Sequence, residues 1–337
     1  MSETKPVALV TGASGFVGRH VVRALTCEGW SVRRAVRSSE GADGEVVIGS
    51  IGPETDWQAA LEGVDAVIHL AARVHYKNDE HAAELYRKVN VEGTLRLAGC
   101  AATAGVRHFI FISTVLVHGR SNDGRAPFSE NDSPTPRGLY GTSKAAAEAG
   151  LRTLARDVDM KISVIRPPLI YGAHAKGNFP LLARAIRLGL PLPFAAIRNR
   201  RNFLAVQNLS SFILHRLRHP DTASNFEIFL LADRERVSTP EFIACMARAS
   251  GKTARLFGVP PNLLGAVLRV MGRQEMQDGL IGSLELDISK AIATGWQPQV
   301  SLEEGCGWRC RIRTPEGGKS AAARNRRRPR LQPGTQQ

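Results

Sequence analysis

Short apolar runs alternate with longer segments of helical periodicity along the first half of the chain. The apolar runs predict strands over residues 7–12, 30–36, 45–50, 65–72, 108–114 and 161–172. Apolar residues at helical spacing predict helices over residues 16–29, about 80–104 and 139–157. Because strands and helices alternate regularly, we expect an α/β fold with a doubly wound parallel sheet covered by helices on both faces. Such sheets bind ligands at the carboxyl ends of their strands.

The pattern becomes less regular after Gly172, where prolines and glycines interrupt it. An apolar run over 226–232 predicts a further strand, and a helix is predicted to begin at Ser238 or Thr239 and to end at Gly251. We therefore divide the chain into a first domain over 1–172, a smaller C-terminal domain over 173–308 that is interleaved with the first, and a basic tail over 309–337.

Composition adds size and charge to this outline. The 337 residues are 43% hydrophobic, which is enough for one large or two medium domains with a core. The formal net charge is +14, but about eight of these charges fall from Arg309 onward. That tail has no apolar periodicity and is predicted to be disordered. A solvated tail is favoured over one that contacts nucleic acid or an anionic surface, so nucleic acid is not an expected partner.

No apolar run of 18 residues is present, and the N-terminal residues have no targeting pattern. We expect a cytoplasmic protein without a membrane span. The five cysteines are an odd number and lack the spacing of metal ligands, which fits a reducing compartment and predicts no metal site.

Three glycines follow the first predicted strand and open the first predicted helix. Gly12, Gly15 and Gly18 stand in the sequence TGASGFVG, where small residues let backbone N–H groups approach a pyrophosphate at the helix N-terminus. An ordinary tight turn is the alternative. The strand, turn and helix context favours a dinucleotide site in a Rossmann-like domain.

The residue at the end of the second strand bears on the choice of dinucleotide. NAD sites usually have an Asp or Glu there for the ribose hydroxyls, whereas Arg suits the extra phosphate of NADP. This chain has Val36 and then Arg37, with Arg33 and Arg34 nearby and no acid. We therefore expect NADP or NAD, with NADP favoured; the alternative is that these arginines are only surface residues.

Polar residues that could reduce a carbonyl accompany the dinucleotide loop. Tyr140 and Lys144 lie one helical turn apart in YGTSK, where the lysine charge is expected to lower the pKa of the phenol and make it a proton donor. Ser113 and Thr114 end a predicted strand at the ligand-binding edge of the sheet. Asn90 stands within a predicted helix, where an amide is a mediocre helix former.

Together these motifs resemble the NAD-dependent epimerase/dehydratase family of extended short-chain dehydrogenases/reductases, over roughly residues 6 to 305. The matching segments are TGASGFVG, VIHLAA, VNVEGT, FISTVLVHG, YGTSK, VIRPPLIYG and ELDISKAIATGWQP. The resemblance implies that Tyr140 is the acid-base, that Lys144 tunes it and binds the nicotinamide ribose, and that Thr114 binds the sugar oxygen. It implies a structural or relay role for Asn90. The implied cofactor contacts are Gly12, Ser14, Gly15, Phe16, Val17, Gly18, Arg37, Leu70, Ala71, Ala72, Tyr140 and Lys144.

The same resemblance implies a C-terminal domain that binds substrate. It places Ser113, Asn178 and Arg201 near a nucleotide sugar, with a loop turn as the alternative for Asn178 and a solvated charge for Arg201. His118 stands where the family commonly has Tyr, and we expect it to be a buried packing residue rather than a proton relay. A homodimer is expected from the resemblance alone.

Three functions remain open at this point. The favoured one is reduction of a UDP-4-keto-6-deoxy-N-acetylhexosamine in surface-polysaccharide biosynthesis, because Arg37 suits an exchangeable NADPH. The second is a UDP-hexose 4-epimerase, acting on UDP-glucose or UDP-N-acetylglucosamine, that keeps its NAD bound. The third is a non-catalytic dinucleotide-binding scaffold whose basic tail recruits a partner.

Overall fold

The computed structural model describes residues 5–74, 81–175, 179–220 and 224–307. Asn178 and the predicted tail over 309–337 lie outside these ranges. In the described residues, no helix is both long and apolar enough to cross a membrane.

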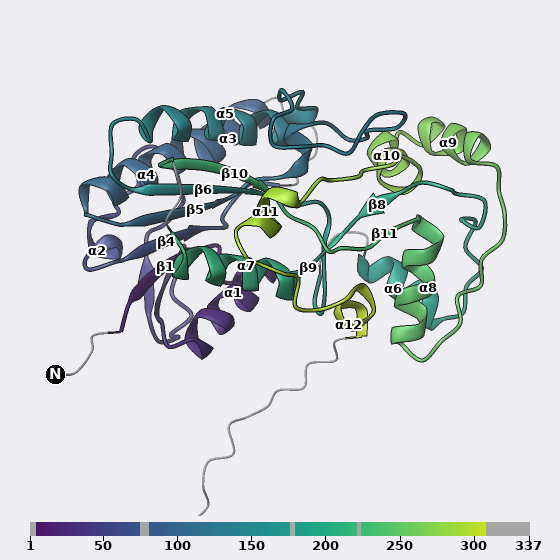
Figure 1. Cartoon of the computed structure of the whole chain (residues 1–337), viewed down its shortest axis with the longest axis horizontal. Coiled ribbons are helices and arrows are strands. Elements are labelled where there is room, and N and C mark those ends of the chain that lie inside the picture. Colours follow the sequence, from purple (N-terminus) through teal and green to yellow (C-terminus); the bar gives the residue numbers. More distant parts are fainter. Residues whose placement is uncertain (1–4, 75–80, 176–178, 221–223, 308–337) are drawn as a thin grey trace, which may run out of the picture.

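A seven-stranded sheet forms the centre of the molecule, and the doubly wound Rossmann-like fold is confirmed (Figure 1). All of its neighbouring strands are parallel, in the order β10-β6-β5-β4-β1-β2-β3. The strands are β1 Val7–Thr11, β2 Ser31–Val36, β3 Glu45–Val47, β4 Ala66–His69, β5 His108–Ile112, β6 Lys161–Arg166 and β10 Phe226–Leu230.

Helices cover the two faces of this sheet because successive residues of each strand point to opposite faces. In β1, Leu9 packs into one core with Leu97 of α4 and Leu151 of α5. Its neighbour Val10 packs into the other core with Phe212 of α7. The helices of these layers are α1 Phe16–Cys27, α2 Gln58–Leu61, α3 Ala82–Tyr86, α4 Gly93–Thr103, α5 Gly138–Leu154 and α7 Val206–Arg218.

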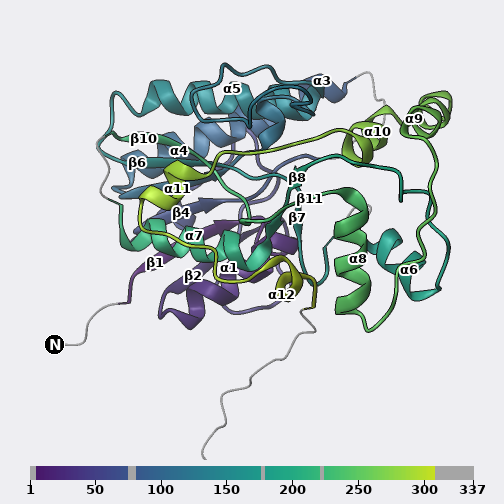
Figure 2. The same cartoon turned by 45° about the vertical axis from the view of Figure 1, so that its right-hand side comes forward.

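A smaller region lies beyond one end of the sheet (Figure 2). It has two short pairs of strands, β7 Ile170–Tyr171 with β9 Leu204–Ala205 and β8 Arg201–Asn202 with β11 Arg236–Val237. Its helices include α6 Phe179–Arg187, α8 Thr239–Ala249, α9 Pro261–Val270, α10 Gln274–Ile281 and α12 Leu302–Gly307, while α11 Ser289–Ala293 contacts β10. Ser238 caps α8 in a capping box with Glu241, so the predicted start of this helix is confirmed.

The chain after residue 172 contributes to both parts of the molecule. β10, predicted as a strand over 226–232, pairs with β6 at the edge of the main sheet, and α7 packs against α1. The domain boundaries at residues 172 and 308 stay a prediction.

Asp233 fixes the end of β10 to the smaller region. Its buried carboxylate accepts hydrogen bonds from the hydroxyl of Tyr171 (2.7 Å), the backbone N–H of Ala205 (3.0 Å) and the Nδ2 of Asn208 (2.7 Å). Burial raises the pKa of Asp233 to about 6, and these hydrogen bonds act in the opposite direction. One side chain therefore joins β7, β9 and α7.

Replacing Asp233 with Ala is expected to lower the free energy of unfolding by about 3–5 kcal/mol, because three buried donors lose their acceptor. Denaturant unfolding followed by circular dichroism measures this change. The exposed Asp159→Ala is the matched control and should change the free energy by less than about 0.5 kcal/mol. Equal stability of the two variants would contradict the role given to Asp233.

Candidate active site

The β1–α1 turn is shaped for a close approach of backbone to ligand. Gly12 has a φ of 67°, and a Cβ there would lie 2.9 Å from the backbone nitrogen of Ala71. A Cβ on Gly18 would lie 2.1 Å from the carbonyl oxygen of Gly12. Gly15 is the N-cap of α1 and offers no side chain to its first N–H groups. The cradle therefore fits a pyrophosphate at the helix N-terminus.

The end of β4 lies against this turn. Thr11 Oγ1 accepts hydrogen bonds from the backbone N–H groups of Leu70 (3.2 Å) and Ala71 (3.1 Å). Two more predicted contacts, Ser14 and Ala72, lie on these connections, and Phe16 and Val17 are the first two residues of α1. The predicted cofactor contacts from β1, α1 and β4 are thus brought together.

The arginines around the end of β2 differ in their surroundings. Arg33 Nη1 donates to the carbonyl oxygens of Ala60 (2.9 Å) and Glu62 (2.8 Å), and Arg34 donates to that of Asp43. Arg37 is exposed just after β2. Arg33 and Arg34 therefore have structural contacts, and the binding of an added ribose phosphate by Arg37 stays a prediction.

Tyr140 and Lys144 lie on α5, one turn apart, as their spacing predicts. The Nζ of Lys144 is buried, donates to the carbonyl oxygen of Ile112 (2.7 Å) and lies 4.2 Å from the ring centroid of Phe111. Burial lowers the pKa of Lys144 to about 7, against the opposite effect of Glu148. Burial also raises the pKa of Tyr140 to about 12. The expected lowering of the phenol pKa was wrong for this structure, since burial outweighs any effect of the lysine.

Gly141 lets α5 approach the segment that follows β5. A Cβ on Gly141 would lie 2.9 Å from the carbonyl oxygen of Leu116, which is in the short 3₁₀ turn Val115–Val117. Thr114 is the N-cap of that turn, and its Oγ1 accepts from the N–H of Leu116 (3.2 Å). The hydroxyl of Thr114 and the phenol of Tyr140 thus come from two elements in tight contact.

Asn90 lies in a π-helical segment, Arg87–Glu92, between α3 and α4. Its Nδ2 donates to Ser143 Oγ (3.0 Å) and to the carbonyl oxygen of Arg73 (3.0 Å), and its Oδ1 accepts from the Arg73 N–H (2.8 Å). Ser143 Oγ donates in turn to the carbonyl oxygen of Tyr140 (2.9 Å). Asn90 therefore joins the connection after β4 to the helix that holds the phenol, and this accounts for an amide within the helical run.

A buried polar cluster beside the site was not predicted from the sequence. Glu148 forms an ion pair with Arg166 (2.5 Å) and accepts a hydrogen bond from the hydroxyl of Ser113. Arg166 Nη1 contacts His118 Nε2 (2.7 Å), and His118 stacks on Phe128. The expectation of a buried packing histidine is confirmed. Because the Ser113 hydroxyl donates to Glu148, a direct contact of Ser113 with a sugar is disfavoured.

The spacing of Glu148 was the available sequence signal for this cluster. It follows Lys144 by four residues and therefore lies on the same buried face of α5. Its partner Arg166 ends β6, far away in the chain, and only the sheet order brings the two together.

Arg201 is buried in the smaller region, not solvated. Its Nη1 donates to the carbonyl oxygens of Asp278 (3.0 Å) and Gly282 (2.5 Å), and burial lowers its pKa to about 10. The guanidinium remains charged at neutral pH. Its contact with a nucleotide diphosphate stays a prediction.

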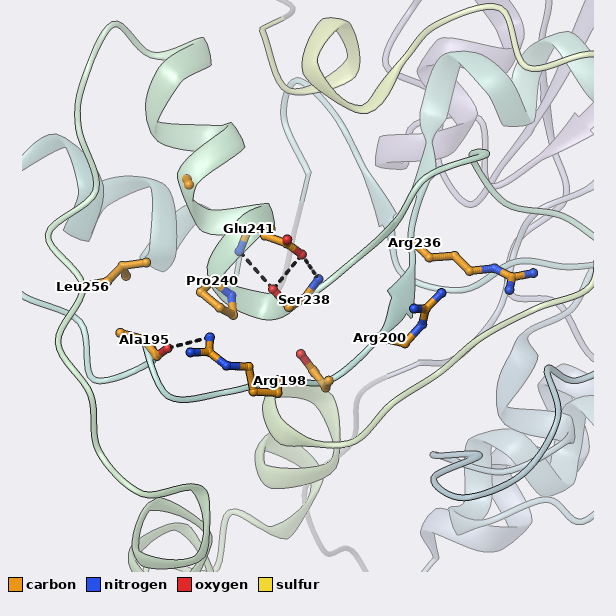
Figure 3. Close-up of a pocket in the computed structure, with 10 residues that line it drawn as sticks. Ala195, Arg198, Arg200, Arg236, Ser238, Pro240, Glu241 and Leu256 are labelled. Carbon is orange, nitrogen blue, oxygen red and sulfur yellow. Dashed lines mark hydrogen bonds between the residues drawn. The ribbon is translucent and has the colours of Figure 1, made fainter.

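A cavity of about 600 Å³ lies near Arg201, and none of its ten lining residues is a sequence-predicted site residue. Figure 3 shows Arg198, Arg200 and Arg236 around it, together with Glu241 at the start of α8. Glu285 forms ion pairs with Arg200 (3.1 Å) and Arg236 (3.4 Å). In the described residues, no cluster of three or more His, Cys, Asp or Glu side chains could hold a metal ion.

Comparison with known proteins decides the family. The model of the NAD-dependent epimerase/dehydratase family matches residues 8–232. The chain belongs to this family. A UDP-glucose 4-epimerase of Vibrio cholerae is 37% identical over 304 residues, which are 88% of this chain and 92% of that protein. An Escherichia coli O157:H7 4-epimerase of N-acetyl-α-D-glucosaminyl-diphospho-ditrans,octacis-undecaprenol is 28% identical over 88% of this chain and 92% of its own.

Solved structures of the family share the fold. UDP-N-acetylglucosamine 4-epimerase from Bacillus cereus has a TM-score of 0.72 at 20% identity, and covers 90% of this chain and 97% of its own. UDP-glucose 4-epimerase from Thermus thermophilus, in complex with NAD, has a TM-score of 0.70 at 23% identity over 89% and 96%. The chain is therefore a member of an NAD-dependent enzyme family, as its sequence motifs predict.

Replacing Gly18 with Ala is expected to weaken dinucleotide binding at least tenfold and to lower the melting temperature, because the new methyl group meets backbone atoms of the turn. Calorimetric titration with NAD and thermal unfolding measure both effects. Gly99→Ala in α4 is the matched control, since a Cβ there meets nothing within 4 Å. This control should retain binding and gain about 0.5–1 kcal/mol of stability. Unchanged NAD affinity in Gly18→Ala would contradict the cradle.

The buried ammonium of Lys144 predicts a pH-dependent difference in stability. Its pKa is about 7 when folded and about 10.4 when unfolded, so between these values the unfolded chain binds more protons and stability rises with pH. The unfolding free energy of the wild type minus that of Lys144→Met should therefore rise by about 1.4 kcal/mol per pH unit in this window. The exposed Lys252→Met should parallel the wild type. If the unfolding free energies of Lys144→Met and of the wild type changed with pH in the same way, the lowered pKa of Lys144 would be contradicted.

Proposed function

We propose that this epimerase/dehydratase enzyme exchanges a hydride at C4 of a UDP-sugar, most simply as a 4-epimerase. The observation that supports this most directly is the packing of α5, which carries Tyr140 and Lys144, against the turn that Thr114 caps, at the same edge of the sheet as the glycine cradle. The chain also has a close relative named as a UDP-glucose 4-epimerase. When bound, the dinucleotide would supply the hydride acceptor and donor.

The chain's own residues would handle the proton and the orientation. An epimerase first oxidises the alcohol at C4, so Tyr140 as phenolate would accept the proton of the C4 hydroxyl and would return it to the same oxygen when the alcohol re-forms. Burial raises the pKa of Tyr140 to about 12, so its phenol is protonated at neutral pH and suits the step that forms the alcohol. Forming the phenolate for the first step would require added positive charge nearby, which a bound oxidised nicotinamide would supply. Thr114 would hold the same oxygen through its hydroxyl, and Lys144 would contact the ribose from the same face of α5. Arg201 would pair with the diphosphate of the substrate.

Reduction of a UDP-4-keto-6-deoxy-N-acetylhexosamine is the second candidate function. It uses half of the same chemistry but requires a reduced dinucleotide in each turnover. The observation that favours it is the exposed Arg37 at the end of β2, where no carboxylate follows the strand and a 2′-phosphate could be bound. NADP would then be preferred to NAD. An assembly of two copies is proposed for either function.

Released nucleotide and substrate turnover distinguish the two functions. The purified chain is denatured and its nucleotide identified by mass; UDP-glucose and UDP-N-acetylglucosamine are then tested for conversion to the C4 epimer. Copurified NAD with interconversion of epimers supports the epimerase. A purified protein that releases no nucleotide and oxidises NADPH only when the 4-keto sugar is present supports the reductase. Neither reaction with any of these sugars would contradict the proposal.

Tyr140→Phe is expected to lose about 10²–10⁴ of turnover and to keep its affinity for the dinucleotide, because the phenol oxygen donates the proton while the phosphate cradle is unchanged. Steady-state kinetics and calorimetric titration with NAD and NADP measure the two properties. Thr135→Val, at a hydroxyl that donates to the His118 carbonyl oxygen, is a control for loss of a nearby hydroxyl. Turnover in Tyr140→Phe equal to wild type would exclude Tyr140 as the acid-base.

A further inference from the structure

Exposed apolar side chains gather in the smaller region. In the described residues, eight of twelve strongly exposed large apolar side chains come from two segments, 181–190 and 257–271. They are Leu181, Leu188, Leu190, Phe257, Leu263, Val267, Val270 and Met271. These segments include α6, α9 and the turns beside them, at the end of the molecule away from the seven-stranded sheet (Figures 1 and 2).

The helix α9 presents the clearest part of this surface. Leu263, Val267, Val270 and Met271 are spaced as one helical face and are 57%, 48%, 91% and 60% exposed. On the opposite side of α9, Gly265 is buried against α10, where a Cβ would lie 3.2 Å from the side chain of Gln277. The helix is thus apolar on the side that packs and also on the side that faces water.

Basic residues accompany this apolar face in the sequence, and the two segments that carry it contain no carboxylate. Residues 251–273 contain no Asp or Glu, and their four basic side chains, Lys252, Arg255, Arg269 and Arg273, are all exposed. Residues 160–220 also contain no Asp or Glu, and Arg184 and Arg187 of α6 are exposed between its leucines.

The chain just after the first segment pairs with the second segment. The N–H of Leu192 donates to the carbonyl oxygen of Arg255 (2.8 Å), and the N–H of Phe257 donates to that of Leu192 (3.0 Å). The exposed Leu190 and Phe257 are each within two residues of this pairing. We call the exposed apolar and basic residues of 181–190 and 252–273 the α9 surface.

We propose that the α9 surface docks on an anionic lipid bilayer. An anionic bilayer binds protein surfaces whose apolar side chains can enter the headgroup region and whose arginines and lysines lie beside them. At ten residues, α9 is about 15 Å long, so it would lie in the plane of the interface. A second copy of the chain fits less well, because a twofold contact would bring the basic side chains of both copies together.

This inference goes beyond the proposed function, because C4 chemistry on a soluble nucleotide sugar needs no membrane. The full chain is sedimented with vesicles of phosphatidylcholine alone or with about one third phosphatidylglycerol. Binding is expected to the anionic vesicles and to be much weaker with the neutral ones. Val270→Glu should reduce binding at least about tenfold, since it removes an inserted side chain and adds a repelled charge. Arg269→Gln should reduce binding about fivefold.

Matched controls separate this surface from other causes of binding. Val47→Glu on β3 changes an equally apolar residue that is 58% exposed, and it should bind like wild type. Turnover of a soluble UDP-sugar should be unchanged in Val270→Glu. Equal binding of Val270→Glu and wild type would assign the attraction to the basic residues after Arg309 and would overturn the proposal. So would the absence of vesicle binding, or a dimer that Val270→Glu splits without affecting vesicle binding.

Discussion

A chain of buried hydrogen bonds from the end of β1, beside the glycine cradle, to α5 is the constraint on which the proposed site depends. Thr11 at the end of β1 contacts His69 (2.7 Å), His69 contacts Thr94 (3.0 Å), and the hydroxyl of Thr94 donates to the carbonyl oxygen of Asn90 (2.7 Å). Asn90 then contacts Ser143 of α5. Burial lowers the pKa of His69 to about 3, so this chain of contacts is uncharged at neutral pH. Neutral hydrogen-bonded groups therefore couple the position of α5, which carries the phenol, to the end of β1, where the glycine cradle begins.

The parts of the site that the sequence predicted are local. The glycine turn follows from small residues between a strand and a helix, and the common face of Tyr140 and Lys144 follows from helical spacing. The strand order and the contacts between distant segments are not local. The pairing of Glu148 with Arg166 depends on where β6 enters the sheet, and the burial of Arg201 depends on carbonyl oxygens about 80 residues away.

The expected lowering of the Tyr140 pKa was wrong because it, too, depends on tertiary structure that local spacing does not show. A lysine one turn from a tyrosine lowers the phenol pKa when both are solvated, but here Lys144 is buried and donates to the Ile112 carbonyl oxygen. Burial then controls both pKa values, lowering that of Lys144 and raising that of Tyr140. A phenol that holds its proton is suited to the half-reaction that forms an alcohol at C4, and the opposite half-reaction of an epimerase requires the phenolate. The α9 surface is likewise a tertiary feature, since α6 and α9 are separated by about 80 residues in the chain.

The fate of the hydrogen at C4 tests the central claim most directly. UDP-glucose that carries deuterium at C4 is incubated with the purified chain and NAD, and the recovered sugars are examined by mass spectrometry and nuclear magnetic resonance. Hydride exchange at C4 predicts that the C4 epimer forms and keeps its deuterium at C4, because the hydride returns to the same carbon. Formation of the epimer with deuterium lost to solvent would show proton abstraction at C4 and would contradict the account.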